Sequence, residues 1–520
     1  MRLRTAALAL PGTFAALLLL HAPLLRLPYF WDEAGYYVPA AFDFYRQGLL
    51  IPVSTLPNGH SPLIFVYLGL AWRWFGFSPL VTRSAMVLMA AGTLLTLFAL
   101  GQRVARREVV VWASLLLALS PLFFAQSSLA QLDLPAALFT TLAVLELLER
   151  RWGGFALAAS LAVMTKETAV ILLVAAGLFA WRERKDLKGQ DWLWLITPMA
   201  PLLIWAAYYH YHTGFWTGNG QYLTYNLYST LKPFHILASL LRRLYEVFIG
   251  AFDWLLWLGA GAGIVWQRRR AGSSATAPSR APGAAPSEVR LVSSPLAHDR
   301  GGREQDFFFL ATAFTAVSVL FHSAVGGAVL PRYLLPAFPL VYLAAAMLLD
   351  RLPRVAARSL MAVVAGLFVA AWFINPPYPF PYEDNLAYSN FVHLHQKAAC
   401  FLAHEPGRPR ILTAWPATDE LTRPFLGYVA RPLHVVRLNG FSPRDFQHVS
   451  ADSFDILYLY SRQWNPQGNW LAHAPLLRDA VERFFEYVPS VPRRELVTAY
   501  HLRPLAVFHD GGQWVELYSK

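Results

Sequence analysis

Two adjacent carboxylates, Asp32 and Glu33, follow Trp31 at the end of the first long apolar run, Thr5 to Pro28. Arg2 and Arg4 precede this run, so a membrane-spanning helix here places both acids on the face opposite the basic end. Carboxylates at a membrane face are costly unless they have a partner or a task, and they can act as general bases. They are therefore candidates for catalysis, with a solvated helix cap as the alternative.

Further ionisable side chains recur in short polar segments between later apolar runs. They are His60, Arg83, Asp133, Lys166 with Glu167, and Arg332 with Tyr333. A lone arginine is explained by a side chain that snorkels to the interface, but charges at one depth in several loops indicate the walls of one polar cavity.

The chemistry that these residue types predict is transfer from a lipid phosphate. Lysine, arginine and histidine at a lipid boundary can hold a phosphate group. Inverting sugar transfer needs one base on the acceptor hydroxyl and a stabilised leaving phosphate, not the carboxylate pair of a hydrolase. The chain has neither a phosphate-binding loop nor a dinucleotide fingerprint, so a soluble nucleotide-sugar or ATP site has no support.

The composition places these residues in a membrane protein. The 520 residues are 56% hydrophobic and 15% charged, whereas soluble domains carry roughly 25% charged residues. The net charge of +12 does not indicate nucleic acid, because Lys and Arg cluster in short loops between apolar runs. A single cysteine, Cys400, excludes an intramolecular disulfide framework and a cysteine-rich zinc site.

Positive-inside reasoning predicts about eleven spans. The first run is expected to be a retained helix with a cytoplasmic N-terminus, because bulky residues and no small-residue cleavage site follow it. The later runs are 62–76, 79–101, 109–126, 134–148, 153–165, 168–181, 192–210, 247–266, 307–323, 332–349 and 359–375. The short run 62–76 holds Arg73 and is predicted to lie in the interface. Segments 29–78, 127–133, 165–168, 211–246, 324–331 and everything after 375 then face outward.

Two domains are expected. Residues 1–375 form the transmembrane domain, and 271–306, rich in Ala, Ser, Pro and Gly, form a flexible cytoplasmic linker within it. Residues 376–520 alternate short strand-like runs at Arg410, His434 and Asp455 with turn residues, which predicts a small α/β domain on the outer side.

Five segments resemble the bacterial protein-mannosyltransferase-like membrane glycosyltransferases of the GT-C group. That group includes the dolichyl-phosphate-mannose protein mannosyltransferases and the lipid A aminoarabinose transferases. The segments are Trp31–Tyr36, Gly59–Leu63, Leu129–Pro135, Met164–Thr168 and Pro331–Pro336, and the similarity covers about residues 25–350. The resemblance implies a mostly α, polytopic GT-C fold that uses a polyprenyl-phosphate sugar at the outer face of the cytoplasmic membrane.

The resemblance also implies roles for single residues. Asp32 matches the catalytic acid of the first outer loop, and Asp133 matches the second acidic position. Arg332 and Tyr333 match the basic-aromatic pair near the lipid phosphate. His60 stands where relatives have Lys or His before Pro-Pro-Leu, although Ser61 replaces the first of these prolines.

Glu33, Arg83 and Lys166 complete the residues expected to bind substrate. Glu33 is expected to act through packing or a salt bridge, because adjacent side chains diverge. Relatives of this branch generally work without a bound metal. The alternative is an oxygen-ligand site for magnesium or manganese built from Asp32, Glu33, Asp133 and Glu167.

The sequence therefore predicts a glycosyltransferase that transfers a sugar, with inversion, to a protein, lipid or glycan acceptor. A transporter or flippase of a lipid-linked glycan is the alternative, but such proteins usually show repeated halves, and no repeat is seen. A binding module on an inert membrane anchor leaves the charged outer loops unexplained.

Overall fold

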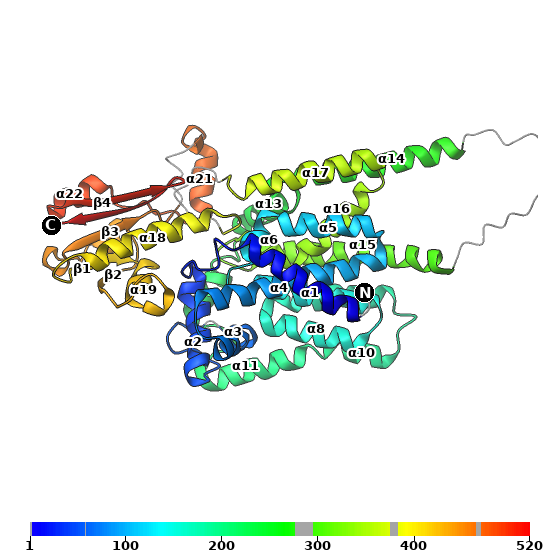
Figure 1. Ribbon diagram of the computed structural model, residues 1–520, viewed down its shortest axis with the longest axis horizontal. Coiled ribbons are helices and arrows are strands. Elements are labelled where there is room, and N and C mark those ends of the chain that lie inside the picture. Colours follow the sequence, from blue (N-terminus) through cyan, green and yellow to red (C-terminus); the bar gives the residue numbers. More distant parts are fainter. Residues whose placement is uncertain (1–2, 58, 276–294, 375–382, 464–469) are drawn as a thin grey trace, which may run out of the picture.

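The main part of the protein is a bundle of helices, and a smaller domain built on a β-sheet lies at one end of it (Figure 1). The computed structural model describes residues 3–57, 59–275, 295–374, 383–463 and 470–520. Every predicted apolar run contains a helix. The helices up to residue 371 are α1 (Leu3–Leu20), α2 (Val38–Gln47), α3 (Leu63–Phe75), α4 (Pro79–Val104), α5 (Arg107–Leu119), α6 (Pro121–Gln126), α7 (Asp133–Leu148), α8 (Trp152–Thr165), α9 (Ile171–Arg182), α10 (Gly189–Ile196), α11 (Met199–Thr213), α12 (Gly220–Leu223), α13 (Pro233–Phe248), α14 (Asp253–Ala275), α15 (Pro295–Ala324), α16 (Phe338–Leu349) and α17 (Arg354–Ala371).

Short π and 3-10 helices lie beside several of these helices and hold residues of interest. They are η1 (Glu33–Tyr37), η2 (Glu167–Val170), η3 (Thr224–Tyr228), η4 (Gly250–Phe252) and η5 (Pro331–Ala337).

The number of about eleven spans is not confirmed. Within the described residues, six helices are long and apolar enough to cross a membrane, and three shorter apolar helices accompany them. The difference arises because several predicted runs form helices of 12 to 16 residues, such as α5, α7 and α9. A helix needs about 20 apolar residues to cross the hydrocarbon core without thinning it.

Prolines shorten two of the predicted runs. Pro121 divides the run 109–126 into α5 and α6, and Pro198 lies between α10 and α11. Proline has no backbone N–H and clashes with the preceding helical turn, which favours the end of a helix at these two positions.

The predicted linker 271–306 is partly helical. α14 continues to Ala275 and α15 begins at Pro295, so helix extends into both ends of this segment. Residues 276–294 lie outside the described residues. Glutamine and arginine are good helix formers, and Gln267 to Arg270 continue α14 beyond the apolar run.

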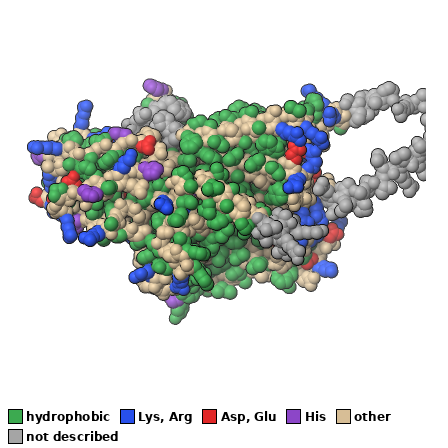
Figure 2. Space-filling model, in the orientation of Figure 1, with side chains coloured by type: hydrophobic (Ala, Val, Ile, Leu, Met, Phe, Trp, Pro, Cys, Tyr) green, Lys and Arg blue, Asp and Glu red, His purple; other side chains and the backbone are tan. Residues whose placement is uncertain are grey.

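The basic loops lie together at one end of the bundle. Lys and Arg side chains gather at the end opposite the sheet domain (Figure 2). Arg106 pairs there with Asp350, and Arg303 pairs with Glu149 at 3.2 Å. Loops far apart in the sequence therefore meet at this end, as the positive-inside argument requires, while the loops predicted to face outward lie at the other end.

The C-terminal part forms the predicted small α/β domain. Its elements are α18 (Ala387–His404), β1 (Arg410–Ala414), α19 (Ala417–Thr422), η6 (Pro424–Leu426), β2 (His434–Leu438), α20 (Pro443–Phe446), η7 (Ala451–Ser453), β3 (Ile456–Tyr460), η9 (Trp470–His473), α21 (Pro475–Phe484), α22 (Arg493–Tyr500), β4 (Arg503–Asp510) and β5 (Gln513–Ser519). The strand order is β2-β1-β3-β5-β4. β1 is parallel to β2 and β3, whereas β5 is antiparallel to β3 and β4. Every residue of β3 is buried, so this strand forms the centre of the domain core.

This domain packs directly against the segment that carries the two adjacent acids. The ring of Trp415 lies 5.2 Å from that of Trp31 in an edge-to-face arrangement. A Cβ atom added at Gly35 would lie 2.7 Å from the Trp415 ring, so only glycine allows this approach. The Tyr428 hydroxyl donates to the carbonyl of Tyr29 at 3.1 Å. The C-terminal domain therefore contacts the predicted first outer loop on both sides of Asp32.

Candidate functional site

Arg332 lies at the centre of the polar site. It is the second residue of η5, which leads into α16, and it is 1% exposed. Its Nη2 donates to Asp32, its Nη1 donates to Glu383 at 2.9 Å, and its Nε lies 3.4 Å from Asp133. One guanidinium group therefore joins carboxylates from three distant parts of the chain.

Asp133 and Lys166 form a second ion pair beside Arg332. Asp133 is the first residue of α7, and Lys166 follows α8. Lys166 Nζ donates to Asp133 at 2.6 Å and lies 4.2 Å from the centre of the Tyr333 ring. A carboxylate at a helix N-terminus is favoured by the helix dipole, so the start of α7 is a suitable position for Asp133.

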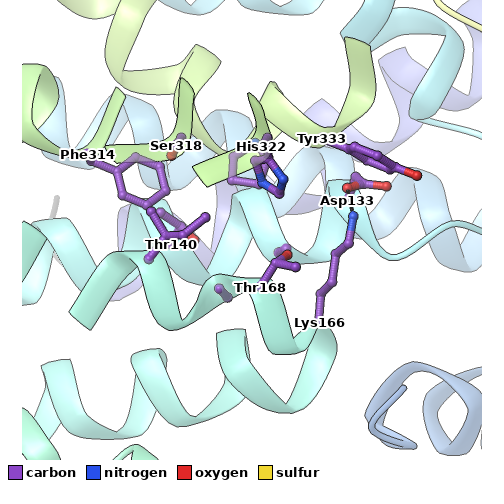
Figure 3. Close-up of a pocket in the computed structure, with 12 residues that line it drawn as sticks. Asp133, Thr140, Lys166, Thr168, Phe314, Ser318, His322 and Tyr333 are labelled. Atoms are coloured by element: carbon purple, nitrogen blue, oxygen red, sulfur yellow. Dashed lines mark hydrogen bonds and ion pairs between the residues drawn. The ribbon is translucent and has the colours of Figure 1, made fainter. Parts of the chain in front are cut away.

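These side chains line a pocket with about 310 Å³ of empty space, including its open mouth. Figure 3 shows Asp133, Lys166, Tyr333 and His322 at one end of this pocket and Thr140, Phe314 and Ser318 at the other. The pocket therefore passes from a charged end into a less polar end formed by α7 and α15, a gradient that suits a ligand with a charged head and an apolar chain.

Arg243 of α13 joins the site, and the sequence reasoning missed it. Its side chain is fully buried, and its guanidinium lies 5.5 Å from the centre of the Tyr333 ring. Nη1 donates to the carbonyl of Leu330 at 2.6 Å and to Glu246 at 2.8 Å. Nε and Nη2 are buried without a hydrogen-bond partner in the described part of the chain. A periodicity analysis of 233–248 could have found it, because α13 is strongly amphipathic.

His60 pairs with Glu167 rather than with one of the central carboxylates. Nδ1 of His60 lies 2.9 Å from Glu167, whose other oxygen accepts from the hydroxyl of Tyr222 at 3.3 Å. Burial raises the pKa of Glu167, but the His60 ring and the Lys166 charge outweigh it, and the pKa falls to about 2. Glu167 is therefore ionised at any physiological pH.

Glu33 and Arg83 form a separate pair with no solvent exposure. Arg83 also donates to the carbonyls of Leu27, Pro28 and Ser128. Glu33 accepts from two backbone N–H groups as well as from Arg83. The structure thus shows the salt bridge predicted for Glu33, and substrate reaches neither residue unless this network opens.

Glu383, which precedes α18, was also missed. Its carboxylate accepts from the side chain of Gln131 at 2.7 Å as well as from Arg332. Burial raises the pKa of Glu383 to about 7, more than the Arg332 charge lowers it. It lies in a segment without a pattern of its own, so a sequence gives no signal for it beyond its charge.

The structure therefore brings together five of the eight predicted site residues. Asp32, Asp133, Lys166, Arg332 and Tyr333 share one cluster. Tyr37 lies between this cluster and His60, at a ring distance of 6.0 Å from the histidine. Glu33 and Arg83 lie in their own buried pair.

Each of the four carboxylates considered as a metal-ligand set has a different basic partner. Asp32 faces Arg332, Glu33 faces Arg83, Asp133 faces Lys166 and Glu167 faces His60. In the described ranges, no group of three or more His, Cys, Asp or Glu side chains is arranged to hold a metal ion.

Comparisons with known proteins show what this chain is similar to. A family model described as dolichyl-phosphate-mannose-protein mannosyltransferase matches residues 59–209. The crystal structure of ArnT from Cupriavidus metallidurans in the apo state matches with a TM-score of 0.52 at 13% identity, over 98% of both chains. The structure of ArnT from the same organism bound to undecaprenyl phosphate matches with a TM-score of 0.52 at 14% identity, over 97% of both chains. No curated protein matches.

Both comparisons confirm the resemblance found in the sequence motifs. The chain is protein-mannosyltransferase-like within 59–209, and over nearly its whole length it has the GT-C fold of ArnT. The fold thus extends the similarity from the motif-bearing part to the C-terminal domain.

Proposed function

We propose that this chain is an integral membrane glycosyltransferase that takes a sugar from a polyprenyl phosphate and passes it, with inversion, to an acceptor at the outer face of the cytoplasmic membrane. The observation that carries the proposal is the cluster around Arg332. It joins a partly exposed carboxylate, Asp32, and two buried cations, Arg332 and Lys166, through ion pairs.

The cations are suited to the phosphate of the donor. Arg332 presents a planar fork that matches phosphate oxygens, and Lys166 lies on the far side of Asp133. Arg243 has two buried nitrogens without a hydrogen-bond partner in the described part of the chain, and its guanidinium also lies beside the Tyr333 ring. As the sugar leaves, the phosphate gains a second negative charge, and fixed cations stabilise that charge in a site of low dielectric.

Asp32 is suited to the acceptor. Its side chain is 21% exposed, more than those of Asp133 and Glu383. In the proposed step the acceptor oxygen forms a bond to the anomeric carbon and Asp32 takes the hydroxyl proton. The bond from that carbon to the phosphate oxygen breaks, and its electron pair stays on the phosphate. Asp133, held by Lys166, shapes the site beside Asp32.

The reaction is proposed to need no resident metal ion, because a cationic or basic side chain already faces each candidate ligand. The proposed partners are the polyprenyl-phosphate donor, a protein, lipid or glycan acceptor, and the surrounding lipids. The ArnT structure bound to undecaprenyl phosphate supports this donor class, because its fold is the one found here.

The test is mass spectrometry of envelope glycans, lipids and glycoproteins from cells that lack this protein and are complemented with either the wild type or Asp32→Asn. We expect one sugar modification to disappear and to return with the wild type alone. A transporter would move its lipid-linked cargo without breaking the phosphate–sugar bond. Full complementation by Asp32→Asn would therefore favour transport and overturn the proposed chemistry.

A further inference from the structure

The guanidinium of Arg332 lies among three carboxylates, and two of its three nitrogens donate hydrogen bonds to them. Nη2 contacts Asp32, Nη1 contacts Glu383 and Nε faces Asp133. A phosphate bound by the arginine fork needs two adjacent N–H groups. A phosphate that binds through the fork of Nη1 and Nη2 therefore competes with Glu383 and Asp32 for these nitrogens.

Glu383 is the carboxylate best placed to give way. Asp133 is held by Lys166 at 2.6 Å, and Asp32 is the proposed base, which must stay ionised. Arg332 is the one cation in contact with Glu383 within the described residues. Its other side-chain partner, Gln131, is neutral.

We propose that the donor phosphate replaces Glu383 at Nη1 of Arg332, and that Glu383 takes up a proton from solvent as it does so. Glu383 is then a positioning residue for Arg332. This inference rests on the proposed function, since it assumes a lipid phosphate donor.

The charges of the cluster favour this exchange. The groups facing Glu383 are Arg332 of η5, Asp32 before η1 and Asp133 of α7, and Lys166 lies behind Asp133. Three carboxylates and two cations carry a formal charge of −1, and a phosphate adds more negative charge. Negative charges that share one cation in a buried site disfavour one another strongly. A proton on Glu383 removes one of the negative charges.

The neutral form of Glu383 also has hydrogen-bond acceptors nearby. The amide oxygens of Gln131 and Gln126 are buried and have no hydrogen-bond partner among the described residues. Both amide nitrogens already donate to Glu383, to its carboxylate at 2.7 Å and to its carbonyl at 3.0 Å. A protonated carboxyl adds one O–H donor. After a modest rotation of its side chain, the amide oxygen of Gln131 or Gln126 can accept this hydrogen bond. Burial already raises the pKa of Glu383 to about 7, so little further change is needed.

The experiment measures binding of undecaprenyl phosphate to the full chain in lipid nanodiscs between pH 5.5 and 9. The wild type, Glu383→Gln and Glu167→Gln are compared. The phosphate of the probe titrates near pH 6, so the informative quantity is the ratio of the wild-type Kd to the variant Kd at each pH, from which the probe's own titration cancels.

For Glu383→Gln we expect this ratio to be near one at pH 5.5 and to rise about tenfold by pH 9. A tenfold rise corresponds to a difference of one unit between the pKa of Glu383 in the free and in the bound protein. For Glu167→Gln the ratio should not change with pH, because the pKa of Glu167 is about 2. A structural role of Glu383 would shift its ratio equally at every pH. A ratio that stays constant for Glu383→Gln overturns the inference and leaves the proposed donor intact.

A second measurement needs no variant. Calorimetry of the wild type at pH 8 in buffers of different ionisation enthalpy gives the protons bound on addition of undecaprenyl phosphate. We expect net proton uptake, and zero uptake or proton release contradicts the exchange. Absence of binding at every pH would instead refute the proposed donor, and the inference with it.

Discussion

Asp32 and Glu33 are neighbours, yet the structure predicts opposite consequences when each is converted to its amide. Asp32→Asn should keep the fold and lose turnover. Glu33→Gln should weaken the fold. The reason lies in their surroundings, since Asp32 is partly exposed at the cluster around Arg332 and Glu33 is enclosed with Arg83 at 0% exposure.

The magnitudes follow from what each substitution leaves behind. Glu33→Gln leaves Arg83 charged and buried against three carbonyls and a neutral amide. Breaking a buried pair in this way costs about 3–5 kcal/mol. Asp32→Asn leaves Arg332 paired with Glu383 and Asp133. Because Arg332 keeps two carboxylate partners, the fold should lose less stability than in Glu33→Gln, while loss of a general base lowers the rate by about 10²–10⁴-fold.

The assay combines thermal unfolding of the purified proteins in one detergent with turnover of the folded fraction on a defined polyprenyl-phosphate sugar. Glu33→Gln should lower the apparent Tm by several degrees while its folded fraction keeps most of its turnover. The double variant with Arg83→Met serves as a control, because its cost should fall short of the sum of the single costs by about 0.5–3 kcal/mol. An unchanged Tm in Glu33→Gln, or wild-type turnover in Asp32→Asn, would refute the reasoning.

Four further outcomes are expected. Arg332→Lys keeps a charge among the carboxylates but loses the fork, so its Kd for undecaprenyl phosphate should rise about tenfold, which binding titration measures. Arg243→Lys should raise the same Kd while leaving the Tm nearly unchanged, and an unaltered Kd would remove Arg243 from the donor site. Because folding raises the pKa of Glu383 to about 7, the folded state binds more protons between pH 4.5 and 7, and this group destabilises the fold as pH rises through that window. The Tm of the wild type relative to that of Glu383→Gln should therefore fall as pH rises across that window and level off above it. Treatment with EDTA should leave turnover unchanged, and loss of activity that Mg²⁺ or Mn²⁺ restores would contradict the metal-free proposal.

Much of the site could be predicted because it depends on topology. Once basic loops are assigned to one side, the charges of the remaining short loops must lie on the other side. That argument placed Asp32, Asp133, Lys166 and Arg332 together, and the structure joins all four. The strand-like runs at Arg410, His434 and Asp455 also proved to be β1, β2 and β3 or to adjoin them.

The remaining features depend on packing that a sequence does not display. Arg243 and Glu383 lie in segments expected only as an outer loop and a domain boundary, and tertiary contacts alone bring them to Arg332 and Tyr333. Arg83 carries the same charge at the same depth as the site residues, and the enclosure provided by Leu27 to Glu33 separates it from them. The number of spans also could not be predicted, because short helices are stabilised by packing against neighbouring helices, which their length does not reveal.

The contact between Trp415 and Gly35 joins the C-terminal domain to the helical bundle close to Asp32, the proposed base. A ring from the C-terminal domain fills the space that a side chain at position 35 would occupy, three residues beyond Asp32. The helical bundle therefore depends on its own C-terminal domain for this contact, and an unrelated domain would not supply it. A chimera that keeps the helices but replaces the C-terminal domain loses the ring that packs against Trp31 and Gly35, on either side of Asp32.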